Sequence, residues 1–381
     1  MPAAHTPGTA LTLDSLPHAR GVWPSIEGEW EALLRETNCR SVFMSRQWME
    51  LWFDVFGSIL RPDVLRWRDA DGRVVALCPV SICRERRGPF IVRRAYLNAA
   101  GEHLLASEHN MVLSLPGHES SVHADLADYV RRRADSLMLS GFVEGAVARV
   151  RAAWPPLGAE EGYESDDRYV PLGLLRSTGT PYLASLSRNT REQVRRSMRL
   201  YCELHGDPVV EVAGNPAQAL AWFVELCDLH AGRWQTRGTA GAFASPGAIR
   251  FHERLIREYT RHAGALDHFA VELTRVRFGD HVVGVLYNLC YYGVANFYQS
   301  GLRYADDNRL KPGLVTHSLA IQRYLDGGDL GEYDFLAGET GGARYKESLA
   351  SERRTLVWCE LMTPTFRNRM IVRLRDWSRG R

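Results

Sequence analysis

The sequence predicts a mixed α/β protein made of two similar halves, and three observations support this prediction. A strand–turn–strand pattern covers residues 64–82 and recurs at residues 269–287, with turn residues at Gly72 and at Asp280. Each hairpin follows a helical pattern, over residues 45–56 in the first half and 248–262 in the second. The turns lie about 208 residues apart, far more than the ~20–50 residues of a solenoid repeat. A duplicated α/β module is therefore expected.

The remaining elements follow from local patterns. Leu126, Val130 and Leu137 repeat at helical spacing, so a helix is expected over 126–137. The uncharged stretch 282–302 is rich in β-formers and polar side chains, which favours two buried strands turning near Tyr292 over a membrane-spanning helix. Prolines and glycines mark the join between the halves. We expect a flexible tail at 1–21, an N-terminal module at 22–175 and a C-terminal module at 176–370.

Composition excludes several classes of protein. The 381 residues are 45% hydrophobic and 24% charged, as in an ordinary globular chain. The 47 basic and 45 acidic residues give a net charge of +2, too little to bind nucleic acid through bulk charge. The seven cysteines include no CxxC pair, which argues against a secreted disulfide framework and a zinc ribbon. No signal peptide is evident, so a cytoplasmic protein without membrane insertion is expected.

An arginine-rich segment follows the join. Thr190 and Gln193 form a capping-box pattern that predicts a helix start at Thr190. The arginines are spaced three, four and four residues apart and would form one stripe: Arg188, Arg191, Arg195 and Arg199. Two interpretations remain open, a solvated charged face or a site for phosphates and nucleic-acid backbones.

A second segment predicts a strand, a loop and a helix that starts at Lys311-Pro312-Gly313 and stops at Gly327-Gly328. We expect free backbone amides at the first turn, reinforced by the charge of Lys311, to form an anion site. The amides belong to Gly313, Leu314 and Val315. The alternative is an ordinary strand–helix junction. Lys311 and Lys346 are the only lysines among the 47 basic residues, which adds a weak indication of a site at both.

A third segment runs from Tyr333 to Gly338 as a strand and continues into a helix that carries Tyr345 and Lys346. The strand contains Asp334, which is costly to bury without a partner. Lys346 or an arginine would supply that partner, in which case the aspartate has a purely structural role.

Taken in order, the three segments resemble the acetyltransferase-like family of the GNAT superfamily that is related to the CelD proteins of cellulose biosynthesis. That family is similar to the FemAB peptidyltransferases. The resemblance covers about 185–355 and implies tandem GNAT-like modules with mixed, partly antiparallel sheets flanked by helices, the first module being a degenerate partner. It also places the donor pyrophosphate at residues 309–315. The family's glycine pattern is incomplete here, because Lys311 replaces its first glycine and only Gly313 remains.

The resemblance implies N-acyl transfer from acyl-CoA, in particular acetyl-CoA, to an amine of a small molecule, sugar or amino-acid derivative, without a metal. An aminoacyl-tRNA-dependent ligase of FemAB type and a non-catalytic scaffold are the alternatives. The expected catalytic residues are Asp334, Tyr345, His317 and Lys346. The expected donor-binding residues are Arg309, Lys311, Gly313, Leu314, Val315, Arg191 and Arg195. The expected acceptor-binding residues are Trp234, Tyr298 and Gln299.

Overall fold

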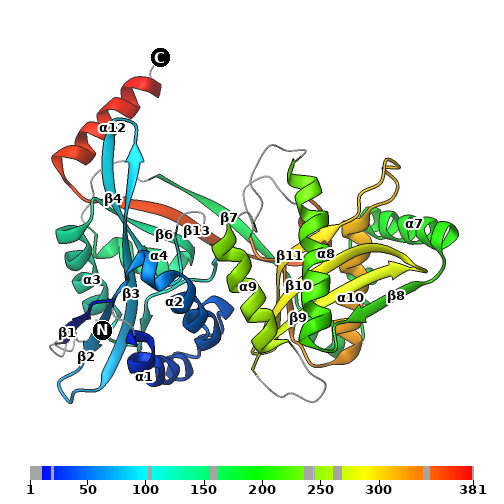
Figure 1. Cartoon of the computed structure of the whole chain (residues 1–381), viewed down its shortest axis with the longest axis horizontal. Helices are drawn as coiled ribbons and strands as arrows, with labels where there is room; N and C mark the ends of the chain where they lie inside the picture. Colours follow the sequence, from blue (N-terminus) through cyan, green and yellow to red (C-terminus); the bar gives the residue numbers. More distant parts are fainter. Residues whose placement is uncertain are drawn as a thin grey trace, which may run out of the picture. The chain divides into compact units, whose positions relative to one another are not determined.

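The computed structural model describes residues 11–18, 21–101, 105–154, 161–235, 243, 245–260, 268–337 and 344–379. The chain forms two compact units. Unit 1 comprises Met1–Glu164 and Thr355–Arg381, and unit 2 comprises Ser165–Arg354. The sequence predicts a single junction between residues 175 and 176. The chain instead crosses between the units twice, once within each of two strands, β7 and β13 (Figure 1).

Unit 1 has a mixed sheet in the order β1-β2-β3-β4-β6-β13, with β5 paired to β3. Its strands are β1 (Thr12–Leu16), β2 (Asp63–Arg68), β3 (Val74–Arg87), β4 (Phe90–Leu97), β5 (Leu113–Ser114), β6 (Ser136–Val143) and β13 (Glu352–Met362). Its helices are α1 (Val22–Glu36), η1 (Val42–Met44), α2 (Arg46–Leu60), α3 (Glu119–Arg133), α4 (Glu144–Ala152) and α12 (Phe366–Arg379). Strands β4 and β6 are parallel, and the other pairs are antiparallel.

The strands of unit 2 follow the order β7-β12-β11-β10-β9-β8, and their pairing is also mixed. Its strands are β7 (Glu161–Val170), β8 (Pro208–Val212), β9 (Phe269–Phe278), β10 (His281–Tyr291), β11 (Val294–Leu302) and β12 (Glu332–Asp334). Its helices are α5 (Leu172–Ser177), α6 (Tyr182–Ser185), α7 (Arg188–His205), α8 (Pro216–Gln235), α9 (Pro246–Tyr259), α10 (Pro312–Gly327) and α11 (Arg344–Leu349). Only β11 and β12 are parallel.

The two units repeat one topology. Each has an edge strand, two helices, three antiparallel strands, a helix, a parallel strand and a further helix. The strand that completes each sheet comes from the other half of the sequence, because β12 pairs with β7 whereas β6 pairs with β13. The duplication is therefore confirmed, and this exchange of last strands explains why the observed boundaries differ from those expected.

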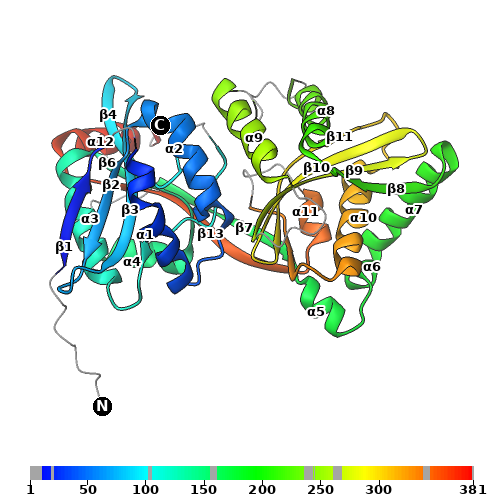
Figure 2. The ribbon, with the colours of Figure 1, turned by 60° about the horizontal axis from the view of Figure 1, so that its bottom comes forward.

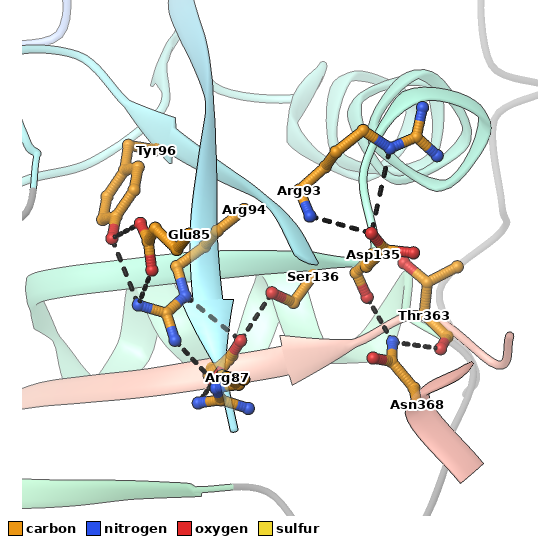
Figure 3. Close-up of polar contacts among 10 residues, drawn as sticks. Glu85, Arg87, Arg93, Arg94, Tyr96, Asp135, Ser136, Thr363 and Asn368 are labelled. Atoms are coloured by element: carbon orange, nitrogen blue, oxygen red, sulfur yellow. Dashed lines mark hydrogen bonds and ion pairs between the residues drawn. The ribbon is translucent and has the colours of Figure 1, made fainter. Parts of the chain in front are cut away.

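Buried polar contacts hold the C-terminal segment in unit 1 (Figure 3). Glu360 of β13 accepts hydrogen bonds from Ser136 Oγ at 2.5 Å and Arg94 Nε at 3.2 Å, and it also binds Arg87. The side-chain amide of Asn368, at the start of α12, donates to the backbone carbonyl of Asp135. These contacts join segments more than 200 residues apart, which local sequence patterns do not reveal.

In unit 2 the helices lie on both faces of the sheet (Figure 2). Helices α8 and α9 pack on one face of β9–β11, while α7 and α10 pack on the other. The core on the α10 face is apolar, with Leu286, Phe297, Leu314, Ile321 and Phe335 among its buried side chains. This arrangement holds the first turn of α10 beside the end of β11.

Several expected elements are confirmed and three boundaries are wrong. Both hairpins, the two strands within 282–302 and the limits of α10 are as expected. Helix α7 begins at Arg188 rather than Thr190, because Ser187 is its N-cap and accepts from the Thr190 amide. Leu137 lies in β6, since α3 ends at Arg133. Part of the expected tail forms β1, which pairs with β2. No helix among the described residues is long and apolar enough to cross a membrane.

Candidate functional site

The first turn of α10 has properties of an anion site. Its N-cap residue is Lys311, whose side chain makes no capping hydrogen bond. Pro312 has no amide hydrogen, and the amides of Gly313 and Leu314 have no hydrogen-bond partner among the described residues. The positive end of the helix dipole and the Lys311 ammonium therefore coincide with two unused donors.

Two of the predicted donor-binding residues differ from the expectation. The Val315 amide donates to the Lys311 carbonyl at 3.1 Å, so it is not a free donor as expected. Arg309 is exposed and forms an ion pair with Asp307 at 2.7 Å. Hydrogen bonds from Arg309 lower the pKa of Asp307 to about 2. The charge of Arg309 is thus already compensated near neutral pH, which leaves Lys311 as the cation of this turn.

The matching turn of unit 1 is different. Helix α3 occupies the same topological position as α10, after the third antiparallel strand. It carries Glu119 in its first turn, and the Glu119 carboxylate accepts from the Gly117 amide at 2.7 Å. A carboxylate at a helix N-terminus repels an incoming anion. Only the unit 2 turn therefore suits a phosphate.

A strand edge opens beside the α10 turn. Strand β12 pairs with β11 only through residues 332–334, opposite 294–296. Strand β11 continues to Leu302 while still paired with β10, so its residues from Phe297 onward have no partner from β12. A β-bulge at Tyr298 interrupts the ladder on the β10 side as well. This edge of β11 leads toward Gly313, where an added Cβ would lie 3.3 Å from the Leu302 side chain.

Tyr345 and His317 lie close together beside this edge. Their ring centroids are 5.4 Å apart, and a Cβ at Gly313 would lie 3.8 Å from the Tyr345 ring. His317 is fully buried, and its Nδ1 is 3.0 Å from the hydroxyl oxygen of Tyr333. Burial, assisted by the charge of Lys346, lowers the pKa of His317 to about 3. The imidazole is therefore neutral at pH 7, and its Nε2 has no partner in the described part of the chain.

Lys346 and Asp334 bind different partners. The Lys346 ammonium donates to the carbonyls of Phe335 at 2.7 Å and Leu336 at 3.1 Å, and it lies 5.5 Å from the centre of the Phe297 ring. Asp334 forms an ion pair with Arg354 and accepts from the Leu336 amide at 2.7 Å. The arginine alternative for Asp334 is therefore the one observed. Arg354 also binds the carboxylates of Asp167 and Glu332.

The predicted arginine stripe is present on α7. Val194, Ser197 and Tyr201 are buried, while Arg188, Arg195, Arg196 and Arg199 are exposed. Arg191 is half-buried and donates to the Ala184 carbonyl at 3.3 Å. Arg195 lies 3.5 Å from Glu192, with both side chains more than half exposed, so that contact neutralises little charge.

The predicted acceptor-binding residues fall on the opposite face of the sheet. Tyr298 contacts His252 of α9, with ring centroids 4.7 Å apart, and Gln299 pairs with Tyr287 of β10 on the same side. His317 and Tyr345 lie on the α10 face. The structure does not bring the two groups together. The side chain of Trp234 lies outside the described residues.

The structure contains a buried polar cluster near α10 that the sequence did not predict. Glu272 of β9, whose side chain has no exposed surface, accepts hydrogen bonds from Tyr324, from Thr274 at 3.0 Å and from Arg323 at 2.9 Å. Asn288 donates to the Tyr324 hydroxyl at 2.9 Å. A charged residue within the apolar pattern 269–273 is a signal for such a cluster, although the sequence does not identify its partners.

Comparisons with known proteins agree with this geometry. Residues 188–347 match the family model described as acetyltransferase (GNAT) domain. No curated protein sequence matches the chain. Among solved structures, the chain resembles the C-terminal domain of a putative lysylphosphatidylglycerol synthetase from Agrobacterium fabrum, with a TM-score of 0.52 and 9% identity over 93% of this chain and 96% of that one. It also resembles FemX, with a TM-score of 0.51 and 10% identity over 89% and 96% of the two chains.

A tandem GNAT protein from the clavulanic acid biosynthesis pathway is another neighbour, with a TM-score of 0.47 and 11% identity over 91% of this chain and 98% of that one. At these identities the structural likenesses concern the fold. The family match covers the segment that contains α7, β11, α10 and the start of α11. Residues 188–347 are therefore an acetyltransferase (GNAT) domain, and the likeness to FemX shows that the two chains share a fold.

Proposed function

We propose that unit 2 transfers an acyl group from acyl-CoA to the amine of a small-molecule acceptor. The observation that carries the proposal is the first turn of α10, where two unused amides, Gly313 and Leu314, lie next to Lys311. These residues fit the pyrophosphate of a CoA thioester, because backbone donors at a helix N-terminus and an ammonium both stabilise phosphate charge.

The chain's own residues then have distinct tasks. The edge of β11 beyond Asn296, with which β12 does not pair, offers backbone groups to the amides of an extended donor arm. Acyl-CoA supplies a thioester carbonyl, which the acceptor amine attacks, so that a C–N bond forms and a C–S bond breaks. Tyr345, beside the first turn of α10, is the residue placed to give its phenolic proton to the leaving sulfur. A water molecule takes the proton released by the amine and returns a proton to the Tyr345 phenolate, so that the net transfer is from the amine to the thiol.

The donor site is tested by calorimetric titration of CoA. Lys311→Ala removes a charge-assisted contact of about 1.5–3 kcal/mol, so the Kd for CoA should rise roughly tenfold to a hundredfold, less at high salt. Gly313→Val should weaken binding through sterics at every salt concentration. Glu119→Gln on α3 is the matched control and should leave the Kd unchanged. Wild-type affinity in both unit 2 variants would show that CoA binds elsewhere.

Tyr345 is tested by the rate of CoA release with any amine that wild type accepts. Tyr345→Phe should lower kcat at least tenfold at an unchanged Kd for CoA, because only the proton is lost. Tyr333→Phe is the control, since the Tyr333 hydroxyl is buried against His317. A normal kcat for Tyr345→Phe would remove the residue from the proposed chemistry.

A second candidate donor is an aminoacyl-tRNA. The exposed arginines of α7 favour it, because Arg188, Arg195, Arg196 and Arg199 form a positive surface on the helix that contacts the start of α10. A small CoA molecule does not need so extended a surface, whereas a nucleic-acid backbone does.

The two donors are separated by one double variant. If an aminoacyl-tRNA is the donor, Arg195→Glu with Arg199→Glu should abolish tRNA retention at low salt. If acyl-CoA is the donor, the same variant should bind CoA with the wild-type Kd. Arg250→Glu with Arg257→Glu, at two exposed positions of α9, makes the same charge change as a control. Wild-type protein that binds CoA but shows no salt-dependent affinity for tRNA would exclude the second candidate.

A further inference from the structure

Helix α12 (Phe366–Arg379) leaves large apolar side chains in solvent. Phe366 is 81% exposed, Trp377 is 62% exposed and Leu374 is 45% exposed. The buried side-chain amide of Asn368 anchors the start of the helix, because it donates hydrogen bonds to the carbonyls of Asp135 and Thr363. Figure 1 shows the rest of the helix continuing beyond the end of the unit 1 sheet. Three such side chains on one 14-residue helix are a patch rather than scattered surface residues.

The exposed residues share one side of the helix. Phe366, Met370, Leu374 and Trp377 are spaced four, four and three residues apart. At about 100° per residue these positions fall within an arc of about 80°, a narrow apolar stripe. Aromatic side chains stand at both ends of the stripe. Trp is enriched at membrane–water interfaces, and Trp, Phe and Leu commonly form the apolar face of helices that lie in the interface.

Arginines surround this stripe. The helix contains five arginines and one aspartate, a net charge of +4. Arg367 is held by Asp135, at 3.1 Å, and by the Ile91 carbonyl, at 2.9 Å. Arg369 and Arg373 are exposed and have no carboxylate partner in the described part of the chain.

The neighbouring strand extends the same surface. The Arg367–Ile91 bond places the start of α12 beside β4, and Ile91 is 62% exposed. Figures 1 and 2 both show the end of the β3–β4 hairpin next to α12. Arg93 of the same strand is about half exposed. The α12 surface, defined as Ile91, Phe366, Leu374 and Trp377 with Arg93, Arg369 and Arg373, thus combines apolar groups with cations.

We propose that the α12 surface binds an anionic lipid bilayer peripherally. The apolar stripe enters the boundary between headgroups and acyl chains, while the flanking guanidiniums pair with lipid phosphates. Charge complementarity selects this occupant, because the exposed Arg369 and Arg373 border the stripe and no carboxylate among the described side chains pairs with them. The helix lies on the membrane rather than across it, since 14 residues rise only about 21 Å. This proposal does not depend on the donor site of unit 2.

Sedimentation of the full chain with vesicles tests the proposal. Wild type should bind vesicles of phosphatidylcholine with 30% phosphatidylglycerol (roughly physiological anionic content) and should not bind phosphatidylcholine alone. Arg369→Glu with Arg373→Glu should reduce the partition coefficient at least tenfold, because each arginine near an anionic surface contributes about fivefold, or about 1 kcal/mol. Phe366→Ser with Trp377→Ser should reduce it similarly, and this loss should persist at low salt.

Two controls keep the result interpretable. Arg35→Glu with Arg132→Glu makes the same charge change at exposed sites on α1 and α3, and its binding should equal that of wild type. Circular dichroism should show all variants folded, since every substituted side chain is exposed. Equal binding of wild type and the two α12 variants overturns the proposal. So does a wild type that ignores anionic vesicles but forms a dimer that Phe366→Ser with Trp377→Ser dissociates, because the surface then joins two copies.

Discussion

The backbone amide of Lys311 donates a hydrogen bond of 2.9 Å to the hydroxyl oxygen of Ser197. Ser197 is fully buried on α7, and Lys311 is the N-cap of α10. Two helices separated by more than 100 residues therefore meet at the turn that carries the unused amides. Because the Lys311 amide is already bound, the turn presents only the donors that follow it. Ser197 thus fixes the orientation of the proposed anion site without contacting a ligand.

Replacing Ser197 should weaken this turn. Ser197→Ala leaves the Lys311 amide without an acceptor, so the free energy of unfolding should fall by about 1–3 kcal/mol, and the Kd for CoA should rise. Urea denaturation and calorimetry measure the two effects. Ser348→Ala is the control, because its hydroxyl bonds to the Tyr345 carbonyl three residues away and to no other described residue. Unchanged stability and affinity in Ser197→Ala would contradict the positioning role.

Asp334 is expected to support the fold through Arg354. Asp334→Asn should lower the free energy of unfolding by about 2–4 kcal/mol, somewhat less than for a fully buried pair because the Arg354 side chain is 36% exposed. Glu347→Gln, which loses an exposed ion pair with Arg168 at 3.6 Å, should cost no more than about 0.5 kcal/mol. Equal denaturation midpoints for the Asp334 variant and wild type would leave a chemical role as the better explanation.

Residues 165–175 should be required for unit 2 to fold. Val170 and Leu172 are fully buried and Leu175 nearly so, and β7 supplies the strand that pairs with β12. Burial of each side chain contributes about 1.5–3 kcal/mol, so the loss of three approaches the whole stability of a domain, about 5–15 kcal/mol. A fragment of residues 165–354 should unfold cooperatively on heating, whereas residues 176–354 should not. Similar melting curves for both fragments would show that the strand exchange is dispensable.

Local sequence signals predicted where the helices and strands of unit 2 begin and end better than they predicted which residues these elements contact. Pro312 and the glycine at 328, with φ at 81°, mark the two ends of α10 because each has a strong positional preference. The N-cap of α7 was misplaced because Ser187 and Thr190 are both good caps and only the structure shows which accepts. The sequence correctly predicted amides without a hydrogen-bond partner among the described residues at Gly313 and Leu314. It was wrong at Val315, whose amide donates to the Lys311 carbonyl as the first hydrogen bond of the helix.

Long-range relationships could not be predicted in this way. Asp334 needed a cation, and the sequence offered Lys346 and many arginines at similar distances along the chain. The choice of Arg354 depends on β13 leaving unit 2 directly after Arg354. Likewise, hydropathy identifies a strand but not its neighbour, so the exchange of β7 and β13 between the sheets carried no sequence signal. The sequence did not indicate on which face of the sheet Tyr298 and Gln299 lie. Tyr298 lies opposite Phe297 by ordinary alternation, and the bulge at Tyr298 keeps Gln299 on that same face, away from Tyr345.

His317 should make stability depend on pH. Its folded-state pKa is lowered to about 3 by burial and by Lys346, whereas an unfolded histidine has a pKa of 6.5. Between these values the unfolded chain binds a proton that the native state excludes. The stabilisation is therefore complete above pH 6.5 and is lost as the pH falls, at about 1.4 kcal/mol per pH unit well below 6.5.

His317→Gln keeps a hydrogen-bonding side chain beside the Tyr333 hydroxyl but cannot titrate. Urea denaturation of both proteins at pH 7.5, 6.5, 5.5 and 4.5 (on the order of one unit apart, to span the titration) should show a shallower loss of stability for the variant. His252, which is also buried with a pKa lowered to about 3, supplies an equivalent slope on the other face of the sheet, and His252→Gln serves as the matched variant. Parallel pH profiles for wild type and His317→Gln would mean that the imidazole accepts a proton in the folded state. In that case His317 would be a candidate general base beside Tyr345.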